Sequence, residues 1–277
     1  MRRQTGLPSA DAQDDFLRAR RSRNLARVAA LLRREPGDVA LILPFDEVVA
    51  ALGRTGERHL GVSSIPVDSI VGSVDRGRDF DRQFRPTSER VRPRWERIAT
   101  ARRRGESMPP IDVYRIGDAH FVKDGHNRVS VARAQGQTTI DASVTEVLTR
   151  VGARRDIRPS ELPLKGHERL FHERVPLPPT VRPRLRLSDP WRYGALAEGV
   201  EAWGFRLMQR DRSLLDREEV ARRWFADEYL PVVKMLAEAG LTADGTETDA
   251  YFRMTCERYR LMLTHEWSAE ALERVRP

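Results

Sequence analysis

The sequence has almost none of the features on which extracellular and membrane proteins depend. It contains a single cysteine, Cys256, among 277 residues, which excludes an intramolecular disulfide and a cysteine-rich zinc site. No stretch approaches the roughly 20 consecutive apolar residues of a membrane-spanning helix. Residues Met1–Gln4 are not followed by the apolar core of a secretory signal. We therefore expect a cytoplasmic protein without a membrane partner.

Lysine is scarce as well. Only three of the 49 basic residues are lysine, which leaves 46 arginines in a chain of net charge +8. A GC-rich coding sequence, which favours arginine, and an anionic partner such as nucleic acid or nucleotide explain this composition equally well. Residues 76–105 contain eleven arginines against four acidic residues. This segment is the candidate anion-facing surface, with Arg102, Arg103 and Arg104 as candidate nucleic-acid contacts.

Changes in the hydrophobic pattern divide the chain into four parts. We expect an N-terminal helical extension over residues 1–59, a small α+β domain over 60–150, a proline-rich linker over 151–188 and a helical domain over 189–277. The linker is expected because seven of the 17 prolines lie between residues 159 and 190.

Within the α+β domain, period-two alternation and turn residues predict short strands, with a helix after the first of them and a second helix over 126–135. The predicted strands are Ile65–Gly72, Ile111–Ile116, Ala119–Val122 and Thr139–Val147, and the first helix is Ser88–Arg104. In the helical domain the aromatic residues are expected in a bundle core, namely Trp191, Trp203, Trp224, Tyr251 and Trp267. The last helix is expected to bury a stripe of Phe252, Cys256, Tyr259 and Leu263.

A helix is predicted in the extension from about Asp14 to Arg34, because apolar side chains recur there at helical spacing. Leu25, Val28 and Leu32 share one face with Ala29, and this face is expected to dock against the rest of the protein. The opposite face is rich in arginine. We expect it to be solvated, and the alternative is a helix that binds nucleic acid or a membrane surface.

The most informative stretch lies where a strand turns into a helix. The apolar run His120–Val122 is typical of a strand and stops at Asp124-Gly125, and a helical pattern follows at once and ends at Gly136. The first backbone N–H groups of a helix have no intrahelical partner, and the helix dipole is positive there. The pattern therefore predicts an anion site, and phosphate is its natural ligand.

Each polar residue of this turn has a functional and a structural interpretation. Gly125 permits the turn, and the Arg128 guanidinium can bind phosphate oxygens, but it can also pair with Asp124 or Glu146. Asp124 and His126 can accept or move protons, but Asp124 can also cap the helix and His126 can serve as a structural hydrogen bonder.

Several motifs resemble the ParB/sulfiredoxin superfamily. They are Ile65-Pro66-Val67-Asp68, Arg85-Pro86, the segment Arg94-Trp95-Glu96-Arg97 and the segment Lys123–Arg128, and together they cover about a third of the chain, residues 60–150. Members of this superfamily bind nucleotide phosphates with a Gly-containing turn and an arginine at the head of a helix. The resemblance implies that Gly125, His126, Asn127 and Arg128 bind the phosphates.

The sequence also departs from individual members of that superfamily. Sulfiredoxin carries its catalytic cysteine where this chain has His126, so sulfinic-acid reduction is not expected. Partition proteins have Gly-Glu-Arg-Arg at the turn and a helix-turn-helix domain, which this sequence lacks in clear form. Serine-kinase members match the turn more closely. The C-terminal part resembles an uncharacterised bacterial helical domain, which implies no activity.

We therefore expect a nucleotide-binding regulatory protein of the ParB-like class that acts at DNA. The expected cofactor is ATP, ADP or CTP with Mg²⁺, and the further candidate partner is a second copy of the chain. No spacing of His or Cys predicts a metal site of the protein's own. The first alternative is a phosphotransferase that acts on a small hydroxylated molecule, with His126 and Asp124 as catalytic residues. The second is a non-catalytic interaction protein.

Overall fold

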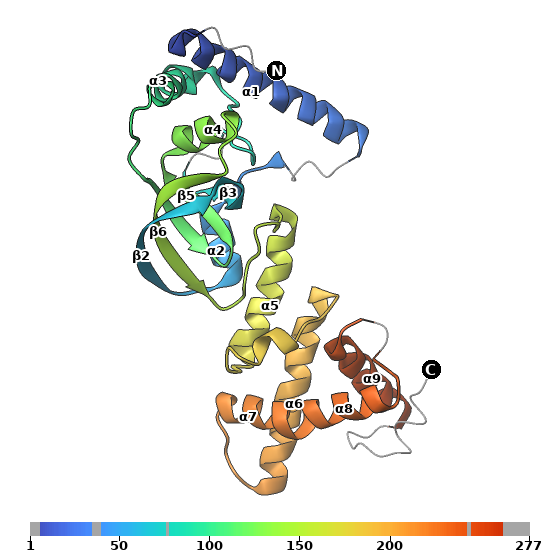
Figure 1. Ribbon diagram of the computed structural model, residues 1–277. Helices are drawn as coiled ribbons and strands as arrows, with labels where there is room; N and C mark the ends of the chain where they lie inside the picture. The colour runs from blue at the N-terminus through green and yellow to red at the C-terminus, as the bar shows by residue number, and fades with distance from the viewer. Residues whose placement is uncertain (1–5, 35–39, 76–77, 243–244, 263–277) are drawn as a thin grey trace. The chain divides into compact units, whose positions relative to one another are not determined.

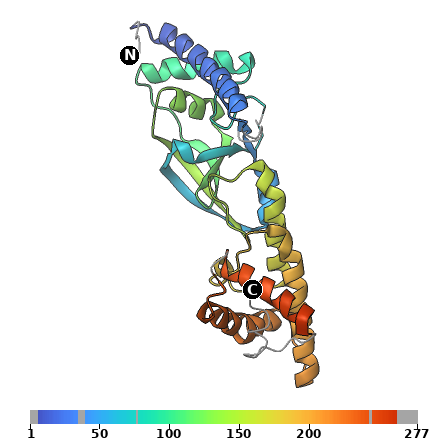
Figure 2. The same cartoon turned by 90° about the vertical axis from the view of Figure 1, so that its right-hand side faces the viewer.

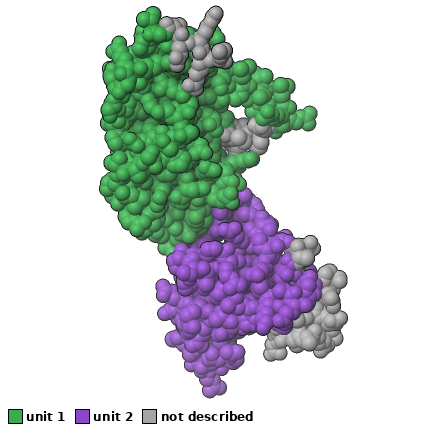
Figure 3. Space-filling model, viewed as in Figure 1, with its two compact units in different colours: residues 1–163 green, residues 164–277 purple. Residues whose placement is uncertain are grey.

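The structure, a computed structural model, describes residues 6–34, 40–75, 78–242 and 245–262. The chain forms two compact units, unit 1 with residues 1–163 and unit 2 with residues 164–277 (Figure 3). Unit 1 combines a sheet with helices, and the described residues of unit 2 contain helices and no strand. The α+β fold that the sequence predicts is therefore confirmed.

Unit 1 is built on a mixed six-stranded sheet with the strand order β1-β3-β5-β4-β6-β2 (Figure 1). Its strands are β1 (Leu43–Pro44), β2 (Arg54–Pro66), β3 (Ile70–Ser73), β4 (Ile111–Ile116), β5 (Ala119–Asp124) and β6 (Thr139–Thr149). Strand β3 pairs in parallel with β1 and β5, and β4 pairs in parallel with β6. Strands β4 and β5 form an antiparallel hairpin, and β2 runs antiparallel to β6 at the sheet edge.

Helices cover both faces of this sheet. They are α1 (Pro8–Leu32), α2 (Phe45–Leu52), α3 (Arg92–Arg103) and α4 (His126–Ala134). Helices α3 and α4 lie on one face with α1 packed over α3, whereas α2 packs on the other face (Figures 1 and 2). Neighbouring residues of β5 serve the two cores, since Val122 is buried in a cluster with Trp95 and Phe121 in a cluster with Phe45.

The hairpin β4–β5, strand β6 and helix α3 lie where the sequence predicts them, but the long strand β2 was not predicted. Nearly all of its side chains are exposed or half-exposed, so its sequence lacks the alternation that identifies a half-buried strand. The strand expected at Ile65–Gly72 is interrupted. Its first residues end β2, a 3-10 turn follows at Val67–Ser69, and β3 begins at Ile70.

Helix α1 docks on α3 through its first half. Phe16 meets the ring of Trp95 at a centroid distance of 5.5 Å, and both side chains are fully buried. The Arg103 guanidinium forms ion pairs with Asp15 at 2.5 Å and Asp11 at 3.6 Å, and both carboxylates are buried. The extension is thus part of unit 1.

The face of α1 expected to dock is the exposed one. Leu25, Val28 and Leu32 are all exposed, whereas Ala12 and Phe16, one helical turn apart, are buried. The prediction was wrong because the apolar stripe of the second half and the docking face of the first half lie on different sides of the helix.

Unit 2 consists of helices around one apolar core. They are α5 (Leu162–Arg174, which begins in unit 1), α6 (Tyr193–Asp211), α7 (Arg217–Arg223), α8 (Leu230–Glu238) and α9 (Glu247–Met262), and a π-helical segment, Trp224–Tyr229, joins α7 to α8. Trp224, Tyr229 and Tyr251 are buried together, with the Trp224 indole N–H donating to the Tyr251 hydroxyl at 3.0 Å. Among the described residues of either unit, no helix is both long and apolar enough to cross a membrane.

The stretch expected to be a linker, 151–188, is folded instead. Helix α5 occupies its centre, and Leu177 and Leu185 are buried in the core of unit 2. Pro163 lies in the first turn of α5, where the missing N–H of proline would have no intrahelical partner in any case. The prolines therefore mark helix starts and turns between buried side chains rather than a flexible connection.

The buried stripe of α9 also differs from the expected one. Ala250, Tyr251 and Met254 are buried, whereas Tyr259 and Cys256 are exposed. The difference arises because the charged Arg258, which lies 3.8 Å from Glu228, is buried at a core position that an apolar pattern cannot reveal. Of the other expected residues, Trp191 is exposed, and Leu263 and Trp267 lie outside the described residues.

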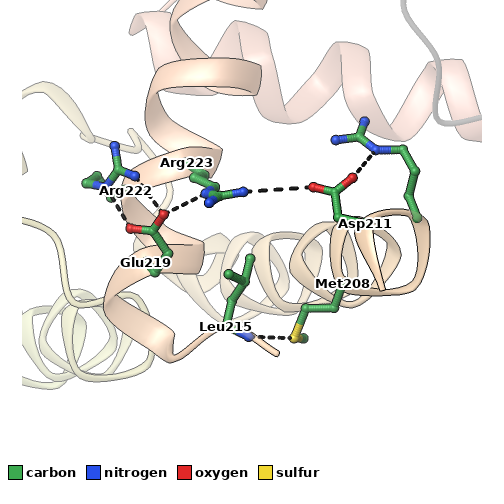
Figure 4. A network of polar contacts seen from close by, with 7 residues as sticks. Met208, Asp211, Leu215, Glu219, Arg222 and Arg223 are labelled. Carbon is green, nitrogen blue, oxygen red and sulfur yellow. Dashed lines mark hydrogen bonds and ion pairs between the residues drawn. The ribbon is translucent and has the colours of Figure 1, made fainter. Parts of the chain in front are cut away.

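A network of charges joins the end of α6 to α7 (Figure 4). The Glu219 carboxylate accepts hydrogen bonds at 2.6 Å from Arg222 and from Arg223, and Arg223 lies 3.8 Å from Asp211. The hydrogen bonds from Arg222 and Arg223 lower the pKa of Glu219 from 4.5 to about 2. At neutral pH the ionised form is therefore favoured in the folded protein.

We expect Glu219→Gln to change how stability depends on pH. The pKa of Glu219 is lower in the folded than in the unfolded chain, so its contribution is complete above about pH 4.5 and disappears as the pH falls towards about 2. Urea unfolding at successive pH values should show wild type losing stability relative to the variant in that window only. Parallel pH profiles for the two proteins would contradict the assignment.

Candidate functional site

The turn between β5 and α4 can be made only by glycine. Gly125 has φ of 103°, a left-handed conformation that L side chains rarely adopt. A Cβ atom at this position would lie 2.4 Å from Cγ2 of Ile111 on β4. Both the backbone conformation and the close approach of Ile111 therefore require Gly125, and together they fix the start of α4 against the sheet.

The N-terminus of α4 has no side-chain cap. Asp124 was one candidate for that role, but its carboxylate instead accepts a hydrogen bond from Arg128 at 2.6 Å. The first intrahelical hydrogen bond runs from the Val129 N–H to the Gly125 carbonyl at 3.0 Å. The preceding N–H groups of the helix have no intrahelical acceptors, and the positive end of the helix dipole lies here.

A shallow hollow of about 20 Å³ adjoins this N-terminus. It is lined by Asp124–Arg128 together with Arg94 and Ile98 of α3, and it accommodates the oxygen atoms of an anion rather than a whole nucleotide. The position of α3 is set by Trp95, whose indole N–H donates to the Ser130 hydroxyl of α4 at 2.8 Å.

Two polar side chains of the hollow lack partners within the described part of the chain. Arg94 is exposed and forms no ion pair with those residues. Asn127 is only 5% exposed, yet its Oδ1 atom accepts no hydrogen bond from them. The unpartnered atom is an acceptor, so a hydroxyl group or a Mg²⁺ ion of a bound ligand would satisfy it, whereas an ionised phosphate oxygen would not.

Arg128 shapes the wall of the hollow. Its guanidinium donates to the carbonyl oxygens of Pro109 at 2.5 Å and Pro110 at 2.7 Å, in addition to Asp124. These contacts connect the start of α4 to the segment that precedes β4. The structural pairing with Asp124 that the sequence left open is therefore present, and Arg94 is the arginine without such contacts.

His126 points into unit 1 and is 5% exposed. Its Nε2 atom lies 2.7 Å from the Ser73 hydroxyl at the end of β3. The rings of Phe80 and Phe84 both lie near the imidazole, each at a centroid distance of 6.3 Å, and lie 6.1 Å from each other. In this conformation the imidazole contacts these protein groups, although His126 also belongs to the lining of the hollow.

The loop that carries these two phenylalanines is held in place by Asp81. The buried Asp81 carboxylate accepts hydrogen bonds from the backbone N–H groups of Gln83 and Arg85 and from the Arg85 side chain. This tight loop places Phe84 at φ of 54°, an uncommon conformation for a phenylalanine.

Arg133 of α4 also holds this loop in place. It donates to the carbonyl oxygens of Val67 and Ile70 and to the Gln83 side chain. Burial lowers the pKa of Arg133 to about 10, which leaves it charged at neutral pH. Its hydrogen bonds are thus those of a structural clamp between α4 and the sheet.

The three candidate nucleic-acid arginines differ in their surroundings. Arg103 is engaged with Asp11 and Asp15 in the docking of α1. Arg102 donates to the Gln137 side chain and is partly buried. Only Arg104 is exposed, and it lies 4.0 Å from Glu106. Arg102 and Arg103 point in directions about 100° apart on α3 and Arg104 follows its last residue, so the three side chains do not form one surface.

A larger cavity of about 890 Å³ lies between α1 and the second half of α4. Its arginines are already occupied, since Arg133 and Arg85 hold the loop described above and Arg18 lies 3.7 Å from Asp15. It does not include the start of α4. Among the described residues, no group of three or more His, Cys, Asp or Glu side chains is placed to hold a metal ion.

Comparison with known proteins adds no assignment. No protein-family model matches the chain, and no curated protein matches it. The resemblance to the ParB/sulfiredoxin superfamily therefore stays a prediction. Among the residues that line the hollow, Arg94 was not predicted as a site residue from the sequence. Its proximity to α4 depends on the packing of Trp95, which no local pattern reveals.

Proposed function

We propose that this protein binds a nucleotide through a phosphate group at the start of α4 and acts as a nucleotide-binding regulatory protein. The observation that carries the proposal is the helix N-terminus behind Gly125, which no side chain caps, beside Arg94, which forms no ion pair with the described residues. Backbone N–H groups and an arginine are the groups that bind phosphate at helix N-termini. The superfamily resemblance supports the same ligand, with ATP, ADP or CTP as candidates.

The surroundings of the other polar residues favour binding over turnover. His126 is buried beside two phenylalanines, and the Asp124 carboxylate is paired with Arg128. A general acid or base must come within hydrogen-bond distance of the group whose proton it transfers. The His126 ring is buried and contacts Ser73, and the Asp124 carboxylate is paired with Arg128, so the contacts of these side chains support binding more than phosphoryl transfer.

We expect Arg94→Ala to weaken nucleotide binding about 10- to 100-fold. A hydrogen bond to a charged group contributes roughly 1.5–3 kcal/mol, and Arg94 has no structural partner among the described residues whose loss would confuse the result. The measurement is isothermal titration calorimetry with ATP, ADP and CTP, each with Mg²⁺.

Arg97→Ala is the matched control. Arg97 lies one turn further along α3, is exposed without an ion pair to any described residue, and does not line the hollow. It should leave nucleotide affinity unchanged. Equal affinities for wild type, Arg94→Ala and Arg97→Ala would place the phosphate elsewhere, and no binding by the wild type would reject the proposed function.

Nucleic acid is a second candidate ligand, because α3 and the residues next to its two ends present a row of arginines. Arg90, Arg94, Arg97 and Arg104 recur at helical spacing and are all exposed, and the first three form no ion pair with described residues. Such a row spans about 20 Å at 1.5 Å per residue, which suits contact with successive backbone phosphates.

The same two variants distinguish these ligands. If DNA lies along α3, Arg97→Ala should reduce DNA retention and its salt dependence while nucleotide affinity is unchanged. DNA retention that neither variant affects would move a nucleic-acid surface away from α3.

A further inference from the structure

The second half of α1 exposes a row of large apolar side chains. Leu25 is 71% exposed, Val28 57%, and Leu31 and Leu32 79% each. They lie within little more than two turns of one helix, and no described residue covers them. In Figure 1 this end of α1 extends past the other helices of unit 1.

These side chains face away from the body of unit 1. The buried face of the first half contains Ala12 and Phe16, and positions on the same side of the second half, at 3.6 residues per turn, are Arg23, Ala26 and Ala30. All three are partly buried. The opposite side carries Leu25, Val28, Leu31 and Leu32, which we call the α1 stripe.

The charges around the α1 stripe have one sign. Residues 16–34 contain seven arginines and no acidic residue. Arg21 and Arg27 are exposed and form no ion pair with described residues. At 3.6 residues per turn, Arg21 lies between Val28 and Leu32. Arg27 lies beside Leu31, so exposed arginines border the stripe. Apolar side chains bordered by arginines suit the interface of an anionic membrane.

Other occupants fit less well. A pair of identical α1 stripes would bring together two helix segments, residues 16–34 of each copy, that are rich in arginine and contain no acidic residue. Four side chains also supply far less than the roughly 800 Å² per partner of a standard protein interface. Nucleic acid satisfies the arginines but leaves the apolar side chains in water. A lipid surface satisfies both, because acyl chains receive the stripe and anionic headgroups attract the arginines.

We infer that the second half of α1 binds the surface of an anionic phospholipid membrane, with Leu25, Val28 and Leu32 inserted among the acyl chains. Such binding attaches the helix to the membrane surface. It does not require a membrane-spanning helix, and the described residues contain none. The inference is independent of nucleotide binding, since the α1 stripe and the start of α4 share no residue.

The test is cosedimentation of the full chain with phosphatidylcholine vesicles, with and without phosphatidylglycerol. Wild type should bind only the anionic vesicles and should dissociate as salt is raised. A triple variant, Leu25→Ser, Val28→Ser and Leu32→Ser, should bind at least about tenfold more weakly. A double variant, Arg21→Gln and Arg27→Gln, should lose about tenfold or more.

The control replaces exposed apolar residues of unit 2, with Phe205→Ser and Leu214→Ser, and should bind like wild type. Circular dichroism and nucleotide titration should give wild-type results for the triple variant, which shows that it is folded. Wild type that fails to bind anionic vesicles overturns the inference. So does a dimer in light scattering that the triple variant converts to a monomer, because the stripe is then covered by a second copy.

Discussion

Gly125→Ala is expected to abolish nucleotide binding and to destabilise unit 1 by roughly 2–6 kcal/mol. A left-handed backbone conformation at a non-glycine residue contributes about 1–3 kcal/mol of this loss, and overpacking contributes a similar amount. The overpacking is specific, because the new Cβ would lie 2.4 Å from Ile111 Cγ2 and 2.9 Å from Ile111 Cβ. Relief of that overlap must move the start of α4, and with it the N–H groups that face the hollow.

The two causes can be separated with matched variants. Gly61 also has a positive φ, 81°, but a Cβ added there meets no atom within 4 Å, so Gly61→Ala should show the backbone contribution alone. Combining Gly125→Ala with Ile111→Ala should recover part of the lost stability by removing the overlap. Urea unfolding measures stability, and calorimetry measures binding. Wild-type affinity in folded Gly125→Ala would show that the turn does not hold the phosphate.

The strand–glycine–helix unit could be predicted because its signals are local. An apolar run, the pair Asp124-Gly125 and the helical pattern up to Gly136 are adjacent in sequence. The orientation of each side chain could not be predicted. Arg128 turns to the Pro109 and Pro110 carbonyls and His126 to Ser73. These partners lie between 18 and 53 residues away in the sequence. The order of the strands in the sheet brings them together, and no local sequence pattern reveals that order.

The same distinction explains the arginines of α3. Their number can be read from the sequence. Which of them face solvent and which form contacts within the protein depends on which side of α3 packs against α1 and α4. Arg94 reaches the hollow because its neighbour Trp95 is buried and bonded to Ser130. Arg103 lies on the side that α1 covers, so its charge is used within the protein.

Arg103→Met is therefore expected to destabilise the protein by about 2–4 kcal/mol, whereas Arg104→Met should change stability by less than about 0.5 kcal/mol. Loss of Arg103 leaves the buried Asp11 and Asp15 without their common cation. The expected loss is at or below that of a fully buried pair, because Arg103 itself is 20% exposed. Arg104 is 63% exposed and 4.0 Å from Glu106, so its removal breaks only a weak surface contact.

Thermal unfolding of the two variants, with limited proteolysis of α1 as a second readout, decides between the two roles. If Arg103 docks α1, Arg103→Met should unfold earlier and expose α1 to protease, and Arg103→Lys should restore part of the stability by keeping a positive charge near Asp15. If Arg102, Arg103 and Arg104 instead form a nucleic-acid surface, Arg103→Met and Arg104→Met should be equally stable and should weaken DNA retention to a similar extent. That second result would support the anion-facing surface that the sequence predicts within residues 76–105.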